Sequence, residues 1–211
     1  GILQLYTRTP SRTAMTAAGL DFVSDGRFTL GLGASGPQVI EGFHGVPYDL
    51  PMQRTREIVE ICRMVWRRER VEHAGRAYTI PLPADQGTGL GKPLKLINHP
   101  VRERIPIVLA SLGQKAVAQT AEIAEGWMPA LYYPERADLV WGDALAAGAA
   151  KRDGSLGALD VFASPALYIG PGAEAVLPVV KEHIALYVGG MGARGKNFYS
   201  EVAALYGFGD D

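Results

Sequence analysis

A predicted buried strand, a turn of small residues and a helix follow one another in the middle of the chain, and this order could bind an anion. An apolar run covers residues 105–109, the turn is Ala110-Ser111-Leu112-Gly113, and Gln114 and Lys115 open the helix. The first turn of a helix leaves backbone N–H groups unpaired and carries partial positive charge, and a glycine there lets a phosphate approach the main chain. We therefore predict a phosphate site, to which Lys115 adds a full charge. The alternative is an ordinary turn whose glycine supplies only backbone freedom.

A second glycine-rich turn follows another predicted strand earlier in the chain. Residues 27–33 form the strand, and the turn contains Ala34, Ser35, Gly36 and Pro37. Neither turn matches the P-loop pattern or the full Gly-x-Gly-x-x-Gly fingerprint. The sequence therefore argues against a nucleoside triphosphatase.

The rest of the chain is predicted to alternate between strands and helices. The expected strands cover residues 1–5, 27–33, 105–110, 127–131 and 159–169, and the helices lie at 10–23, from 51, from 114, at 134–151 and at 172–188. Thr9 can cap the first helix and Pro10 can open it. Such alternation requires a parallel sheet with right-handed crossovers, which is either open and doubly wound or closed into a barrel. Periodicity alone does not distinguish the two.

An insertion at about residues 71–104 interrupts this alternation. Residues 71–80 alternate around an Ala-Gly turn as a short hairpin does, and a segment rich in glycine and proline leads back to the strand at 105. No linker divides the chain, so residues 1–211 are interpreted as one domain.

Composition and charge exclude several classes of partner. The chain is 47% hydrophobic and 20% charged, with a formal net charge of −1 and no long run of either sign. We therefore expect a small-molecule substrate, and neither nucleic acid nor a membrane surface as a partner. No apolar run is long enough to span a membrane, and the first residues lack the regions of a signal peptide, so the expected location is the cytoplasm.

Side chains that could act as metal ligands or nucleophiles are scarce. The histidines, acidic residues and single cysteine show no metal-ligand spacing, so no metal is expected. The chain has no Gly-x-Ser-x-Gly elbow, and Cys62 lies among Ile58, Ile61 and Val65 on one face of an amphipathic helix. Cys62 is therefore predicted to be a buried core thiol and not a nucleophile.

Several of these segments, taken in their order along the chain, resemble the bacterial-luciferase-like family of flavin and deazaflavin oxidoreductases. The resemblance is to the branch that uses the deazaflavin coenzyme F420. The segments that carry it are residues 6–10, 25–33, 44–47, 73–80, 110–115, 121–127 and 187–199.

The resemblance implies an α/β fold of the (β/α)8 TIM-barrel type, with the active site at the carboxyl ends of the strands. The match implies that this barrel is incomplete, with the N-terminal strands and the last strand missing. Incomplete sheet edges favour self-association, so we expect a homodimer.

The same resemblance implies which residues contact the cofactor. Backbone contacts to its phosphate would come from Ala110, Ser111, Leu112 and Gly113, and Gln114 and Lys115 at the start of the predicted helix are also expected to contact the cofactor. Gly33, Ala34 and Ser35 would lie at the other flank, and a non-proline cis peptide bond at Gly1-Ile2 would lie behind the ring. Trp127 is expected either to line the cofactor cleft or, like Trp66, to pack in the core. Arg194 and Lys196 could attract an anionic cofactor tail.

The function implied is hydride transfer between bound coenzyme F420 and an organic substrate. One alternative is an FMN-dependent luciferase-like monooxygenase. Another is a truncated barrel that binds flavin or assembles with a partner without turnover. The resemblance assigns no catalytic acid or base, because many such residues would come from strand ends outside this sequence.

Overall fold

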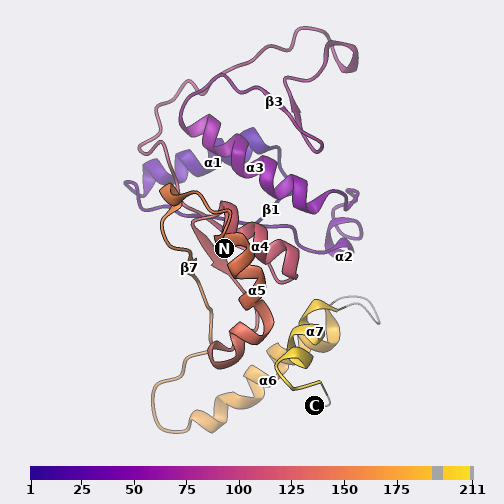
Figure 1. Cartoon of the computed structure of the whole chain (residues 1–211), viewed down its shortest axis with the longest axis vertical. Helices are drawn as coiled ribbons and strands as arrows, with labels where there is room; N and C mark the ends of the chain where they lie inside the picture. The colour runs from indigo at the N-terminus through magenta and orange to yellow at the C-terminus, as the bar shows by residue number, and fades with distance from the viewer. Residues whose placement is uncertain (192–196, 210–211) are drawn as a thin grey trace.

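Five short parallel strands form the centre of the structure, a computed structural model that describes residues 1–191 and 197–209 (Figure 1). Their order across the sheet is β1-β2-β5-β6-β7, so neighbours in the sheet follow one another along the chain once the insertion is set aside. The bounds are β1 Leu3–Gln4, β2 Leu30–Gly33, β5 Ile107–Ala110, β6 Gly126–Met128 and β7 Asp160–Val161. The predicted α/β class with a parallel sheet is confirmed.

A helix lies in each connection between neighbouring strands of this sheet. Their bounds are α1 Pro10–Val23, α3 Pro51–Trp66, α4 Gln114–Ile123 and α5 Ala137–Ala149, with a short α2 at Pro37–Ile40 before α3. α1 packs beside α3, and α4 packs beside α5 (Figure 1). This is the repeating strand–helix unit of a (β/α) barrel wall.

The start of α1 and the buried face of α3 agree with the predictions from the sequence. Thr9 caps α1 as predicted, because its side-chain oxygen accepts a hydrogen bond from the Arg12 N–H at 3.4 Å, and Pro10 is the first residue of the helix. Cys62 on α3 is fully buried, as predicted. Burial raises the pKa of its thiol to about 12, so the thiol stays protonated.

Two groups of buried side chains stabilise the fold. One lies between α1, α3 and strands β1, β2 and β5, and it includes Trp66, whose indole N–H donates to the Ala14 carbonyl at 3.0 Å. The second contains Val117, Trp127, Ala137, Val140, Trp141, Ala144, Val202 and Tyr206. The last two members come from α7 (Phe198–Leu205) and the residue after it, so the C-terminal helix packs on the second group.

The predicted hairpin of the insertion is present as β3 (His73–Ala74) and β4 (Thr79–Ile80), and the irregular segment after it contains a 3-10 turn at Ala84–Gln86. The hairpin is attached to α3 through one buried carboxylate. Glu57 accepts hydrogen bonds from the N–H groups of Arg76, Ala77 and Tyr78 at 2.8–3.2 Å.

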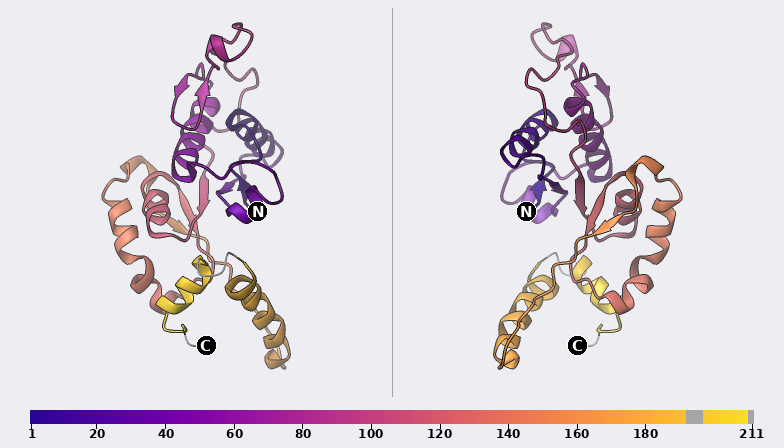
Figure 2. Two further views of the ribbon diagram at one scale, coloured as in Figure 1. Left: turned by 90° about the vertical axis from the view of Figure 1, so that its right-hand side faces the viewer. Right: turned by 90° about the vertical axis from the view of Figure 1, so that its left-hand side faces the viewer.

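Three predicted elements differ most from the structure. The strand expected at 159–169 contains only β7, because in the described residues the last backbone hydrogen bond to β6 comes from the Phe162 N–H to the Trp127 carbonyl, and Pro165 lacks an N–H. The helix expected at 172–188 divides into a 3-10 turn at Ala173–Val176, α6 at Leu177–Ala185 and a π turn at Leu186–Gly190. The strand expected at 127–131 ends at Met128, just before Pro129. Figure 2 shows α6 standing away from the sheet.

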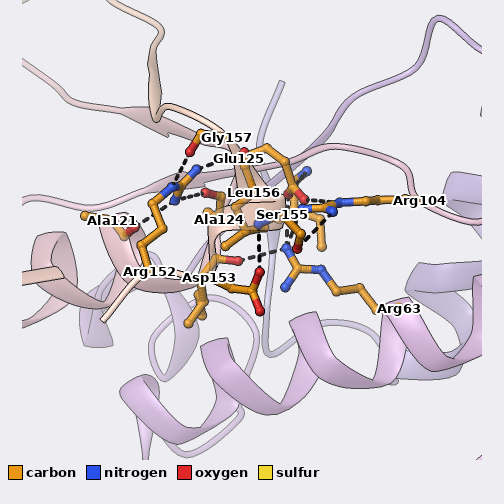
Figure 3. A network of polar contacts seen from close by, with 12 residues as sticks. Arg63, Arg104, Ala121, Ala124, Glu125, Arg152, Asp153, Ser155, Leu156 and Gly157 are labelled. Carbon is orange, nitrogen blue, oxygen red and sulfur yellow. Dashed lines mark hydrogen bonds and ion pairs between the residues drawn. The ribbon is translucent and has the colours of Figure 1, made fainter. Parts of the chain in front are cut away.

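Charged side chains join the amino ends of the strands (Figure 3). Glu125, just before β6, accepts hydrogen bonds from Arg63 at 3.1 Å, from Arg104 at 3.0 Å and from the Ile107 N–H at 2.9 Å. Arg152 donates to the Ala121 and Ala124 carbonyls at the end of α4. In barrels of this kind, interactions at the amino face of the strands serve stability.

Replacing Glu57 by Gln should destabilise the fold at neutral pH. It should also make the free energy of unfolding fall less steeply as the pH is lowered into the acid range. Burial alone would raise the pKa of Glu57, but the three N–H donors and the His73 side chain together outweigh it, so the pKa in the folded state lies below the ordinary value of 4.5. The carboxylate therefore contributes stability that is present above pH 4.5 and is lost as the pH falls towards the folded pKa. We expect Glu57→Gln to cost about 2 kcal/mol in urea unfolding at neutral pH.

The matched control is Glu60→Gln on the same helix, where the carboxylate is exposed. It should change the free energy of unfolding by less than about 0.5 kcal/mol. Equal losses for the two variants would contradict the assigned role of Glu57.

Candidate functional site

The two predicted glycine turns lie side by side at the carboxyl ends of adjacent strands. Gly33, the last residue of β2, is paired with Ala110, the last residue of β5. A methyl group on Gly33 would lie 3.4 Å from the Ala110 Cβ and 2.9 Å from the Ile2 Cγ2, so the strands approach closely here. The structure therefore brings Gly33, Ala34 and Ser35 next to the turn at 110–113.

Gly1 and Ile2 lie against the same strand. The Gly1 carbonyl oxygen lies 2.5 Å from where a Cβ on Gly31 would be, so only glycine fits at position 31. The predicted cis bond at Gly1-Ile2 is wrong, because within the described residues the cis bond is Ile80-Pro81. A non-proline cis bond costs about 3 kcal/mol, and the exposed Gly1 keeps the ordinary trans form.

Ser35 adopts the left-handed conformation, with φ +59°, directly after β2. Its carbonyl accepts a hydrogen bond from the Tyr48 hydroxyl at 3.3 Å. Leu50 and Leu131 also have positive φ, and both lie in connections that leave the carboxyl ends of strands. Non-glycine residues in this conformation are strained and are enriched at functional sites.

The start of α4 offers unpaired main-chain donors. Gly113 is the N-cap residue in an extended conformation (φ −67°, ψ 144°), and no side chain caps the helix. Over the described ranges, no hydrogen-bond acceptor is assigned to the N–H groups of Gln114, Lys115 and Ala116. A helix start with three free donors and no side-chain cap suits a phosphate.

Two carbonyl groups of the same turn accept hydrogen bonds from buried indole N–H groups. Trp127 donates to the Ser111 carbonyl at 3.0 Å, and Trp141 donates to the Leu112 carbonyl at 2.9 Å. Trp127 is fully buried, with its ring edge-to-face on Trp141 at 5.0 Å. The expectation that Trp127 lines the cleft is therefore wrong, and the alternative of core packing, for Trp127 as for Trp66, is confirmed.

The side chains at this turn are directed towards the helices. The Ser111 hydroxyl lies 2.9 Å from the Thr120 hydroxyl within α4, and the Gln114 amide donates to the Val140 carbonyl on α5. Lys115 is exposed and borders a shallow hollow between α3, α4 and α5, together with Lys151. The turn therefore has only its main chain available to an anion, and the charge of Lys115 lies on the side of the hollow between the helices.

A cluster of three tyrosines around Arg54 lies at the same end of the sheet and was missed by the sequence analysis. The Arg54 guanidinium carbon lies 5.0 Å from the Tyr6 ring centroid and 5.3 Å from that of Tyr78, and Tyr6 stacks on Tyr48 at 5.1 Å. Burial is the main cause that raises the pKa of Tyr6 well above its ordinary value, so its hydroxyl stays protonated and donates to the Asp49 carbonyl at 2.8 Å. The signal in the sequence was a tyrosine directly after a strand.

The first residue of α7, Phe198, approaches the turn at 110–113. A Cβ on Gly113 would lie 3.6 Å from the Phe198 ring, which is half exposed. Arg194 and Lys196 lie outside the described residues. In residues 1–191 and 197–209, no group of three or more His, Cys, Asp or Glu could hold a metal ion, and no helix is long and apolar enough to cross a membrane.

Comparisons with known proteins agree with this architecture. A provisionally named coenzyme F420-dependent oxidoreductase of Mycobacterium tuberculosis is 44% identical over 98% of this chain and 60% of its own length. The 5,10-methylenetetrahydromethanopterin reductase of Archaeoglobus fulgidus is 26% identical over 90% of this chain and 53% of its own length.

A solved structure has the same fold. The coenzyme F420-dependent tetrahydromethanopterin reductase of Methanopyrus kandleri superposes with a TM-score of 0.75 at 21% identity, over 98% of this chain and 58% of that one. The chain thus spans between 53% and 60% of the length of these three proteins. The luciferase-like monooxygenase family profile matches residues 1–211, and the chain belongs to this family.

Proposed function

We propose that this chain provides the cofactor-binding part of an oxidoreductase that transfers a hydride between coenzyme F420 and an organic substrate. The observation that carries the proposal is the row of free N–H groups at the start of α4, beside the Gly33–Ser35 turn at the same end of the sheet. The relative from M. tuberculosis supports F420 as the cofactor.

The residues have distinct roles in this proposal. The N–H groups from Gln114 to Ala116 hold the phosphate, and Lys115 adds a positive charge beside it. The turns at 33–35 and 110–112, with Gly1 and Ile2, form the wall against which the cofactor lies. The bound cofactor supplies the hydride chemistry, and the chain positions it and shields it from water.

Two alternatives come from different observations. The description of the matched family favours an FMN-dependent monooxygenase. This chain spans 60% of the length of the relative from M. tuberculosis. That fraction favours a barrel segment that binds flavin or assembles with a partner without turnover. Because β1 and β7 each have one paired neighbour in the described sheet, our proposal includes a homodimer in which these edges are covered. The proposal also places the protein in the cytoplasm, where Cys62 stays reduced.

Titration of the protein with F420 and FMN side by side tests the function. We expect F420 to bind with a change in its absorption spectrum and FMN to bind more weakly. Tighter binding of FMN would favour the monooxygenase, and binding of neither at high micromolar concentration would overturn the proposal. Hydride transfer by this chain, compared with a longer form that carries further strands, separates an active barrel from a non-catalytic one.

Replacing Gly113 by Asp should stabilise the protein while it weakens cofactor binding. The conformation of Gly113 is accessible to any residue, and a carboxylate there would cap α4 and raise the free energy of unfolding by about 0.5–1 kcal/mol. The same carboxylate would repel a phosphate and reduce affinity by about tenfold or more. Thermal unfolding and F420 titration measure the two effects.

Gly113→Asn is the matched control, because Asn caps a helix as well as Asp does but carries no charge. It should weaken binding much less than Gly113→Asp. If the two variants bind F420 equally, the phosphate does not lie at this helix start.

A further inference from the structure

Two buried tryptophans from different elements bind consecutive carbonyl groups of one turn. Trp127 belongs to β6 and Trp141 to α5, and both side chains are fully buried. Their indole N–H groups donate to the carbonyls of Ser111 and Leu112 at 3.0 Å and 2.9 Å. Both peptide groups that lead into Gly113 are therefore fixed from the core side.

Fixing a carbonyl also fixes the N–H group of the same peptide. In a trans peptide the C=O and the N–H point in opposite directions. Because the carbonyls of residues 111 and 112 point at the indoles, the N–H groups of Leu112 and Gly113 point away from the core. No acceptor is assigned to either N–H within the part of the chain that the structure describes.

We propose that Trp127 and Trp141 are positioning residues that turn the N–H groups of Leu112 and Gly113 outward, so that these two donors join those at the start of α4 in holding a phosphate. The inference rests on the proposed function and extends the anion site from the helix start back into the preceding turn. It assigns the two tryptophans an effect on ligand affinity that packing alone would not give.

The packing around the two indoles keeps them in place for this role. Trp127 and Trp141 meet edge-to-face at 81°, and Tyr206 packs edge-to-face on Trp141 with ring centroids 5.9 Å apart. Tyr132 stacks on Trp141 and meets Trp127 edge-to-face. An indole held on two sides cannot swing away from its carbonyl without disrupting its neighbours.

Trp66 provides a control for loss of packing. It is also fully buried, and its indole donates to the Ala14 carbonyl at 3.0 Å, in α1 and away from the turn. Phe in place of any of the three tryptophans removes one indole N–H from a main-chain carbonyl and leaves a similar gap. Only Trp127→Phe and Trp141→Phe release a carbonyl of the phosphate turn.

The experiment compares the three variants by backbone 15N NMR order parameters and by titration with F420 and with inorganic phosphate. Trp127→Phe and Trp141→Phe should lower the order parameters of the Leu112 and Gly113 amides and weaken binding by about five- to tenfold. Trp66→Phe should leave the order parameters of these two amides and both affinities at the wild-type values. If Trp127→Phe fails to fold, Trp141→Phe carries the same test at the neighbouring peptide.

The outcomes separate this inference from the proposed function. If wild-type protein binds F420 and the two turn variants match Trp66→Phe in order parameters and affinity, the inference is overturned and the proposed function stands. If wild-type protein binds neither F420 nor FMN, the proposed function fails. In that case, lower order parameters confined to Leu112 and Gly113 together with weaker binding of inorganic phosphate support the positioning role, and order parameters or phosphate binding equal to those of Trp66→Phe overturn it.

Discussion

The close parallel pairing of β2 with β5 is the contact on which the candidate site depends. Gly31 and Gly33 leave no side chain on one face of β2, so the Gly1 carbonyl and the Ile2 side chain lie directly against that strand. The register places the last residue of β2 opposite the last residue of β5, which brings the two following turns to the same level. A shift in the register of β2 against β5 would move the two turns to different levels, so that they would no longer lie side by side.

The two ends of the sheet are stabilised by opposite means. At the amino ends, Arg63 and Arg104 pair with Glu125, and that carboxylate also accepts the first N–H of β5 (Figure 3). At the carboxyl ends near α4, the carbonyls are paired and the N–H groups are open. The carboxylate of Glu125 is therefore paired within the chain at one end, and partial positive charge faces outward at the other.

Local patterns in the sequence predicted the features that depend on neighbouring residues. The apolar face of α3, the Thr9 cap and the β5–α4 turn each require only a few consecutive residues, and the structure contains all three. The tyrosines around Arg54 come from positions 6, 48 and 78, so no local pattern could bring them together. Strand length was overestimated after residue 161, because an apolar segment becomes a strand only where a partner strand pairs with it.

Trp127 shows why a residue's place in a motif does not decide its role. Its position just after the start of β6 was compatible with the cleft or with the core, and the choice depends on the packing of α5, which the sequence of β6 does not contain. Its buried ring still contacts the turn before α4 through one N–H. The stability of the fold would favour a capped α4 with its donors filled, whereas the proposed anion site needs those donors free. The chain leaves glycine at the cap and these donors unfilled, and it stabilises the turn instead by pairing two of its carbonyls with buried indoles.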